Sequence, residues 1–298
     1  MKNWLLFVML SIAVAFVSHA QPRYFADEII PLWAMNAPGG GGPRGEIQVS
    51  RKGAFTHIAK PMMYLYRPLK PNGKSVLIAA GGGYRRINMK KEAVPAALWL
   101  KSLGYTAYIL VYRLPLEHWR DGNLVALQDA QRAIRLIRAK HQPLSLLGFS
   151  AGAHLLALAG LKIQSPNYPP QDSIDQIPIK LSGIAMIYPI VTLMPPYSHT
   201  STHKVLVGKG ASLEQDARWS VENYVTKASP AIFAVQADDD AISSVENTHI
   251  LEKVCQENGV PIDVHLFKTG GHGFAMGRAG TPTIAWPNMY LKWLNKLR

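Results

Sequence analysis

Segments typical of β-strands and segments typical of helices alternate along most of this chain, and this alternation restricts the fold more than any other feature. The run at 105–112 (YTAYILVY) is apolar without interruption, as expected for a strand that is buried on both faces. Apolar residues at helical spacing follow it at 123–140. The other expected strands are 57–66, 75–80, 144–147, 184–188, 231–236 and 264–268, and the other expected helices are 92–103, 151–163, 245–258 and one from 284 onward. This order predicts an α/β fold, with a mostly parallel sheet flanked by helices on both faces.

The first twenty residues have the pattern of a cleavable signal peptide. Lys2 supplies a positive start, 4–17 is apolar, and Ser18-His19-Ala20 is a small-x-small cleavage site. The apolar stretch is shorter than the roughly 20 residues that span a bilayer, which favours cleavage after Ala20 over an uncleaved anchor. The sequence therefore predicts a periplasmic or secreted protein with no stable membrane insertion after cleavage.

The rest of the chain, 21–298, is expected to form a single domain, because no internal repeat or Pro/Ser-rich linker divides it. A content of 48% hydrophobic residues in 298 supports a substantial core and excludes disorder as the main state. Cys255 is the only cysteine, so the chain cannot form an intramolecular disulfide. No Cys/His cluster of the structural-zinc type is present, and neither a metal nor a cofactor is expected.

The charge balance is basic, with a formal net charge of +13. The basic residues are spread along the chain, and one group recurs at helical spacing, which predicts a solvated helix face; this group is Arg132, Arg135, Arg138 and Lys140. No basic run is interleaved with aromatic residues, so nucleic acid is not an expected partner. An acidic surface or an acidic polysaccharide stays open as a partner.

A G-x-S-x-G motif stands at 148–152 (GFSAG), between an expected strand and an expected helix. This strand–turn–helix context is where a strained turn exposes a nucleophilic serine, here Ser150. The helix N-terminus behind Ser150 favours developing negative charge. An ordinary Gly/Ser turn at the start of a helix has the same letters, but the context favours catalysis.

A catalytic serine needs a base and a carboxylate that orients the base, and in such a sheet their order along the chain is serine, acid, histidine. His272 lies in a glycine-flanked loop (GGHGF, 270–274) after the strand at 264–268. Three aspartates, Asp238, Asp239 and Asp240, follow the strand at 231–236. The carboxyl ends of parallel strands meet at one sheet edge, so one of these aspartates is expected to contact His272.

The other histidines are weaker candidates. His154 lies one helical turn past Ser150 and is expected to pack beneath the turn rather than titrate. His199 and His203 fall in an expected loop that could line the pocket. Two histidines without a carboxylate partner are weak evidence for a metal site.

A glycine run at 81–83 follows the strand at 75–80. Backbone N–H groups of Gly82 and Gly83 are expected to join the amide of Ala151 in an oxyanion hole. A phosphate-binding loop is also glycine-rich, but here neither G-K-[ST] nor the G-x-G-x-x-G spacing is present.

Together these motifs resemble the α/β-hydrolase superfamily, and within it the bacterial carboxylesterases with a G-G-G-Y oxyanion loop, often described as acetylxylan-esterase-like. The resemblance covers roughly 55–298 and rests on GGGY at 81–84, KKEAVPAALWLKSLGYTAYILVYRLP at 90–115, LQDAQRAIRLIR at 127–138, GFSAGAH at 148–154, SP at 229–230, DDDAISSVEN at 238–247 and GGHGF at 270–274. It implies Ser150 as nucleophile, His272 as base and, by register from 245–247, Asp240 as the acid, with Asp239 as the alternative.

The chain departs from this family's pattern at three places. Ala80 replaces the histidine of the usual H-G-G-G loop, and Gln236 stands where the strand commonly ends in histidine. Ser243-Ser244 replace Val-Pro in the turn after the aspartates, which leaves room for a one-residue slip between Asp239 and Asp240.

The function implied by the resemblance is a serine carboxylesterase that hydrolyses short acyl esters through an acyl-enzyme and deacetylates a sugar or polysaccharide. Its partner would be a small ester or an acetylated carbohydrate. The alternatives are a prolyl-oligopeptidase-like serine peptidase, a non-catalytic hydrolase-fold binding protein and a basic polyanion-binding protein. The sequence carries no signal for an oligomeric state.

Overall fold

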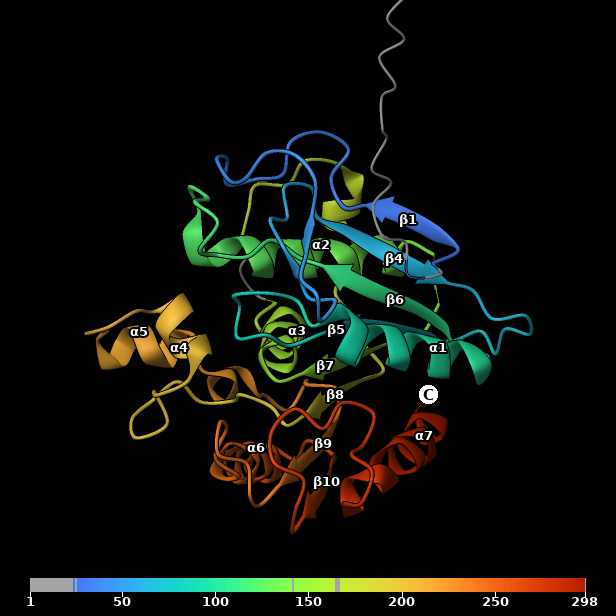
Figure 1. Cartoon of the computed structure of the whole chain (residues 1–298), viewed down its shortest axis with the longest axis vertical. Coiled ribbons are helices and arrows are strands. Elements are labelled where there is room, and N and C mark those ends of the chain that lie inside the picture. The colour runs from blue at the N-terminus through green and yellow to red at the C-terminus, as the bar shows by residue number, and fades with distance from the viewer. Residues whose placement is uncertain (1–23, 25, 141, 164–166, 298) are drawn as a thin grey trace, which may run out of the picture.

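The computed structural model describes residues 24, 26–140, 142–163 and 167–297, so the proposed signal peptide lies outside the described residues. At its centre is an eight-stranded sheet in the order β1-β4-β6-β5-β7-β8-β9-β10 (Figure 1). Its strands are β1 (Glu28–Pro31), β4 (Met62–Tyr66), β5 (Ser75–Ala79), β6 (Thr106–Val111), β7 (Leu144–Phe149), β8 (Gly183–Ile187), β9 (Ala231–Ala237) and β10 (Ile262–Phe267). Pairings from β6 to β10 are parallel, whereas β4 runs antiparallel to both β6 and β1. The predicted mostly parallel sheet is confirmed.

Helices cover both faces of this sheet, as predicted (Figure 1). The α-helices are α1 (Val94–Ser102), α2 (Val125–Arg138), α3 (Ala151–Leu161), α4 (Ser201–Leu206), α5 (Leu213–Arg218), α6 (Glu246–Glu257) and α7 (Trp286–Lys296). Helices α1 and α7 share one face, where Trp99 stacks on Tyr290. Helices α2, α3 and α6 cover the other face, and α2 packs directly on α3. Among the described residues, no helix combines the length and the apolar character needed to cross a membrane.

The strands are apolar because helices bury both of their faces. Every residue of β4, β5, β7 and β8 is buried, which explains why these strands are predominantly apolar. One cluster of buried apolar side chains extends from Leu32 to Leu294. The organisation of 21–298 as one domain stays a prediction.

The expected strand at 57–66 is wrong at its start. The strand in the central sheet begins at Met62, after Pro61, which has no N–H group to donate to a neighbouring strand. Phe55–Thr56 instead form β3, which pairs with β2 (Gln48–Val49) in a separate two-stranded sheet. His57, expected in a strand, follows β3 with a φ of 62°.

The predicted solvated basic face of α2 is also wrong, because Arg132 and Arg135 are buried. The Arg132 guanidinium pairs with Asp172 at 2.6 Å and Asp175 at 2.9 Å, and it stacks over the ring of Trp33. These partners belong to irregular segments that cover α2 and that have no periodic pattern in the sequence. Only Lys140 of the predicted group is exposed.

Candidate active site

Ser150 lies in the turn between β7 and α3, with a φ of 52° that is unusual for a residue with a side chain. The turn is tight enough to require its two glycines. A Cβ atom on Gly152 would lie 2.2 Å from the Ala79 carbonyl oxygen, and one on Gly148 would lie 2.3 Å from the Ala153 Cα. The turn therefore leaves no room for side chains at positions 148 and 152.

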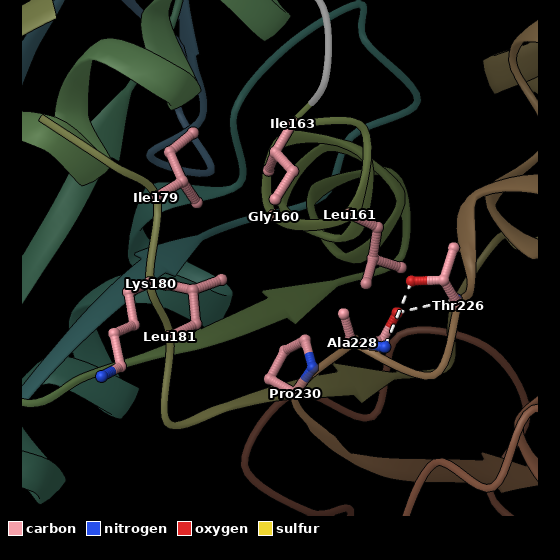
Figure 2. Close-up of a pocket in the computed structure, with 10 residues that line it drawn as sticks. Gly160, Leu161, Ile163, Ile179, Lys180, Leu181, Thr226, Ala228 and Pro230 are labelled. Carbon is pink, nitrogen blue, oxygen red and sulfur yellow. Dashed lines mark hydrogen bonds between the residues drawn. The ribbon is translucent and has the colours of Figure 1, made fainter. Parts of the chain in front are cut away.

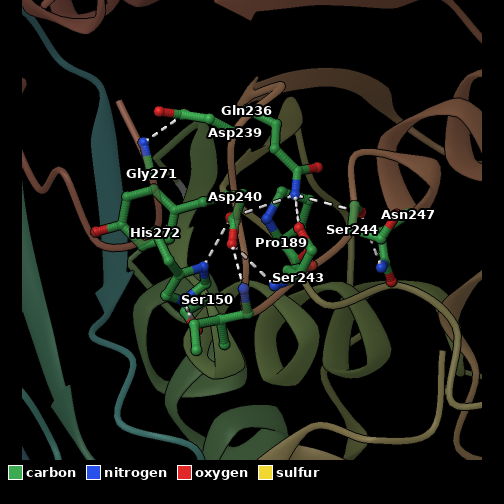
Figure 3. Close-up of polar contacts among 12 residues, drawn as sticks. Ser150, Pro189, Gln236, Asp239, Asp240, Ser243, Ser244, Asn247, Gly271 and His272 are labelled. Atoms are coloured by element: carbon green, nitrogen blue, oxygen red, sulfur yellow. Dashed lines mark hydrogen bonds and ion pairs between the residues drawn. The ribbon is translucent and has the colours of Figure 1, made fainter. Parts of the chain in front are cut away.

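The structure brings Ser150, His272 and Asp240 into one contact chain at the carboxyl edge of the sheet (Figure 3). The Ser150 Oγ lies 2.8 Å from His272 Nε2, and His272 Nδ1 lies 2.8 Å from Asp240 Oδ2. Because a carboxylate only accepts hydrogen bonds, this contact places the imidazole proton on Nδ1 and leaves Nε2 free to accept the serine proton. A serine, a histidine and a carboxylate in this order can act as a nucleophile, a base and the acid that orients the base.

Each of the three successive aspartates has a different partner. The Asp240 side chain is fully buried, and its Oδ1 accepts from the backbone N–H groups of Ile242 and Ser243, each at 2.9 Å. Asp239 instead accepts from the Gly271 N–H at 2.7 Å, a hydrogen bond that lowers the pKa of its carboxyl. Asp238 pairs with Lys268 at 3.1 Å on the surface. Asp240 is thus the aspartate in contact with His272, and Asp239 supports the histidine loop.

The departures at Gln236 and Ser243 form a polar network that holds Asp240 (Figure 3). The Gln236 amide donates to the Ser243 carbonyl oxygen at 2.6 Å and accepts from the Thr248 hydroxyl at 2.5 Å. The Ser243 hydroxyl donates to the Pro189 carbonyl oxygen at 2.6 Å, which ties the aspartate turn to the end of β8. Side-chain hydrogen bonds therefore fix the turn in this chain.

The glycine loop borders the same cavity as Ser150. Gly82 and Gly83 line it, with φ values of 131° and 63° that favour glycine. A Cβ atom on Gly82 would lie 2.1 Å from the Arg86 carbonyl oxygen. The Gly81 N–H already donates to Glu92 Oε2 at 2.6 Å. Ala151 is the first residue of α3, directly after the serine.

Sequence reasoning missed Glu92 and Tyr188, which connect the glycine loop to the histidine loop. Besides accepting from Gly81, the buried Glu92 carboxylate accepts from the Tyr188 hydroxyl at 3.2 Å. That hydroxyl accepts from the Ala275 N–H at 3.2 Å, and the Tyr188 ring lies edge-on to the His272 ring, with centroids 5.0 Å apart. Burial raises the pKa of Glu92. Glu92 lies within the stretch 90–115 that carries the family resemblance, but nothing in the sequence pairs it with Tyr188, so only the fold reveals the connection.

Neither His199 nor His203 lines the cavity that contains Ser150. His203, expected to lack a carboxylate partner, contacts Asp216 at 2.8 Å, which corrects that reading of the sequence. The neighbouring residues Thr200, Ser201 and Thr202 line the cavity in place of His199 and His203. Within the described part of the chain, no group of three or more His, Cys, Asp or Glu residues could hold a metal ion.

His154 packs beneath the serine turn, as predicted. The Tyr84 hydroxyl contacts its Nδ1 at 2.9 Å, and its Nε2 lies 2.7 Å from the Trp219 carbonyl oxygen, so Nε2 carries the proton. Burial lowers the pKa of His154 to about 4 from a reference value of 6.5. The ring is therefore neutral at neutral pH.

This burial predicts a specific loss of stability in acid. The unfolded chain takes up a proton at His154 near pH 6.5, whereas the folded chain resists protonation until about pH 4. The free energy of unfolding should be unaffected by this group above pH 6.5 and should fall by about 3 kcal/mol across that window. Urea unfolding of wild type and His154→Gln at several pH values measures it. The variant should show a shallower decline, and equal slopes would contradict the assignment.

Two cavities lie at opposite edges of the sheet. The one that contains Ser150 and His272 has a volume of about 330 Å³. The other, of about 320 Å³, lies before β8 and β9 at their amino ends (Figure 2). There the hydroxyls of Thr226 and Ser229 accept backbone hydrogen bonds within their own turn, at 3.3 and 2.9 Å. Of these two cavities, only the first is lined by a serine hydroxyl in contact with a histidine.

The sheet, the serine turn at its carboxyl edge and the flanking helices define an α/β-hydrolase. The sequence model of the BD-FAE family matches residues 63–254, more than half of the chain. This chain therefore belongs to the BD-FAE family.

Two curated proteins are similar to this chain in sequence. The chain is 27% identical over 210 residues to an endo-1,4-beta-xylanase B of Butyrivibrio fibrisolvens, covering 67% of this chain and 32% of that protein. It is 24% identical over 229 residues to an acetylxylan esterase of Xylanibacter ruminicola, covering 73% of this chain and 44% of that protein. The chain thus spans less than half the length of both proteins.

A solved structure matches nearly end to end. It is an acetyl ester-xyloside bifunctional hydrolase from Caldicellulosiruptor lactoaceticus, with a TM-score of 0.75 and 28% identity. The match covers 93% of this chain and 98% of that one.

Proposed function

We propose that this protein is a serine carboxylesterase that hydrolyses short acyl esters through an acyl-enzyme and removes acetyl groups from a sugar or polysaccharide. The contact chain from Ser150 through His272 to Asp240 carries this proposal, because these groups form a nucleophile, a base and its orienting acid beside an open cavity.

In the proposed reaction, His272 Nε2 accepts the Ser150 proton while Oγ attacks the ester carbonyl carbon. The carbonyl oxygen becomes negative, and the N–H groups of Gly82, Gly83 and Ala151 stabilise it. The protonated His272 then donates its proton to the leaving alcohol oxygen, and the acyl group remains on Oγ. Water repeats the sequence: it gives a proton to His272, attacks the acyl carbon and releases the acid, and the proton returns to Ser150.

The similarity to these proteins supports acetylated carbohydrates as the substrate class. The relatives include an acetylxylan esterase and an acetyl ester-xyloside hydrolase, and the match to the second covers 93% of this chain. The N-terminal pattern supports export, with cleavage after Ala20, and a periplasmic or secreted enzyme would meet such polymers.

A substrate panel tests the proposal. Rates on p-nitrophenyl acetate, butyrate and octanoate should fall with acyl length, by about tenfold or more from acetate to octanoate, and acetylated xylan should release acetate. The folded Ser150→Ala variant serves as the blank. Cleavage of peptides without turnover of these esters would favour the peptidase alternative. Salt-dependent retention on polyanions without any turnover would favour a binding protein.

A further inference from the structure

The cavity that holds Ser150 adjoins a larger cavity of about 590 Å³. The two cavities share three lining residues, Arg86, Asn88 and Lys91. The far part of the second cavity is lined by Arg51 and Lys52. We call the second cavity the basic groove. Because the two cavities share these lining residues, they lie side by side.

Four cationic side chains line the basic groove, namely Arg51, Lys52, Arg86 and Lys91. All four residues are exposed, and no carboxylate in the described part of the chain forms an ion pair with any of them. The acidic lining residue of the joined space, Glu92, is buried and bonded to Gly81 and Tyr188. Apart from the electrostatic interaction of Lys91 with Glu92, the groove therefore presents positive charge that has no ion-pair partner among the described carboxylates.

The positive charge extends to the reacting groups. Lys91 directly precedes Glu92, and its Nζ would lie 3.2 Å from a Cβ atom placed on Gly273, the residue after His272. Arg86 lies three residues beyond Gly83, and its Nε donates to Asn88 at 3.3 Å. A chain of cations thus connects the serine cavity to Arg51 and Lys52.

The backbone around the groove is held in place. Arg51 and Lys52 are the turn residues of the hairpin formed by β2 and β3. Phe55 and Ile87 exchange two backbone hydrogen bonds, at 2.8 and 2.9 Å, and the Lys90 N–H donates to the Gly53 carbonyl oxygen at 3.2 Å. These bonds dock the hairpin onto the segment that follows the glycine loop, so the cations are presented from ordered backbone.

We propose that the basic groove binds an anionic group on the saccharide that carries the ester, so that the enzyme acts on an acetylated acidic polysaccharide. This inference rests on the proposed function. An acetyl group is too small to reach beyond the serine, so the sugar chain lies outside the serine cavity, and the basic groove is the larger cavity that adjoins it. Carboxylate and sulfate groups on sugars both pair with guanidinium and ammonium groups, and a uronic acid carboxylate is the form we expect.

Matched oligosaccharides test this inference with the full chain. We would measure kcat/KM for acetate release from O-acetylated oligogalacturonides and from neutral O-acetylated xylo-oligosaccharides, at 20 and 200 mM NaCl. At low salt, the uronate substrate should be hydrolysed about tenfold more efficiently, and salt should reduce this advantage because screening weakens exposed charge pairs. An O-acetylated, sulfated xylo-oligosaccharide distinguishes sulfate from carboxylate, and a preference for either anion supports the proposal.

The double variant Arg51→Gln/Lys52→Gln should lose about tenfold in kcat/KM for the uronate substrate, mainly through a higher KM. Lys292→Gln/Lys296→Gln is the control, since it removes the same charge from exposed positions on α7. The end of α7 lies at the opposite edge of the sheet, where Lys74, just before β5, donates to the Leu297 carbonyl oxygen. This control should retain the uronate preference.

Three outcomes would overturn the inference. If wild type hydrolyses the neutral and anionic substrates equally, the proposed esterase function stands and the groove assignment is wrong. If the control loses as much as the groove variant, overall charge explains the preference and the groove does not. If neither oligosaccharide nor p-nitrophenyl acetate is hydrolysed, the proposed function itself fails and the inference fails with it.

Discussion

Ser150→Ala is expected to lower kcat for p-nitrophenyl acetate by about 10³-fold or more. The Ser150 hydroxyl is the one that His272 Nε2 contacts, at 2.8 Å, and no methyl group can form the acyl-enzyme. The turn should keep its conformation, because its backbone bonds from Ser150 N to Ile187 O and from Ala153 N to Ser150 O do not involve the side chain. Ester hydrolysis rates and circular dichroism measure the two effects.

Ser201 offers a matched control in the same cavity. Its hydroxyl donates to the Gly83 carbonyl oxygen and accepts from Arg85, each at 3.1 Å, so it is engaged away from His272. Ser201→Ala should therefore lose far less activity than Ser150→Ala. Comparable losses from both variants would show that the cavity tolerates no change of shape, and near-wild-type hydrolysis by a folded Ser150→Ala would contradict the nucleophile assignment.

Asp240→Asn should lower kcat by about 10³- to 10⁴-fold, because an amide cannot replace the carboxylate that fixes the imidazole tautomer and stabilises the imidazolium. The side chain is buried against His272 Nδ1 at 2.8 Å, with two backbone N–H groups on its other oxygen. An asparagine has only one acceptor oxygen, so its NH2 group would have to face either His272 Nδ1 or the two backbone N–H groups. The imidazole ring would then lose its preferred protonation state.

Asp239→Asn is the matched comparison, one residue away. Its oxygen can still accept from the Gly271 N–H, so the loss should stay within about tenfold. The two variants are compared by kcat on the same ester, with thermal unfolding as the check on folding. If Asp239→Asn lost most of its kcat and Asp240→Asn lost little, Asp239 and not Asp240 would be the acid. The contact between Ser150 and His272 would be unaffected by that result.

Local signals in the sequence are sufficient to predict the serine turn and the histidine loop. Ser150 lies between a strand and a helix, and His272 lies between glycines after a strand. Both patterns involve only residues that are close together in the sequence. The choice among the three aspartates is different in kind. It depends on which carboxylate faces inward, and the residue types alone leave this open. Counting back from 245–247 in the family's pattern predicted Asp240. The structure places Asp240 in contact with His272.

The features that sequence reasoning missed all depend on contacts between distant segments. The burial of Arg132 requires Asp172 and Asp175 from an irregular segment. Glu92 and Tyr188 meet only because their elements converge at the carboxyl edge of the sheet. The basic groove likewise joins the hairpin turn at Arg51 to the segment beside the glycine loop. No periodicity marks such contacts, since each partner alone looks like an ordinary surface residue.

Covalent trapping tests the central claim, that Ser150 carries the acyl group, most directly. The protein would be treated with a fluorophosphonate, in which a serine oxygen displaces fluoride from phosphorus, and the adduct would be located by peptide mass spectrometry. We expect one adduct, on the peptide that contains Ser150, formed in step with the loss of esterase activity and absent from Ser150→Ala. An adduct on another residue, or full esterase activity after complete labelling, would contradict it.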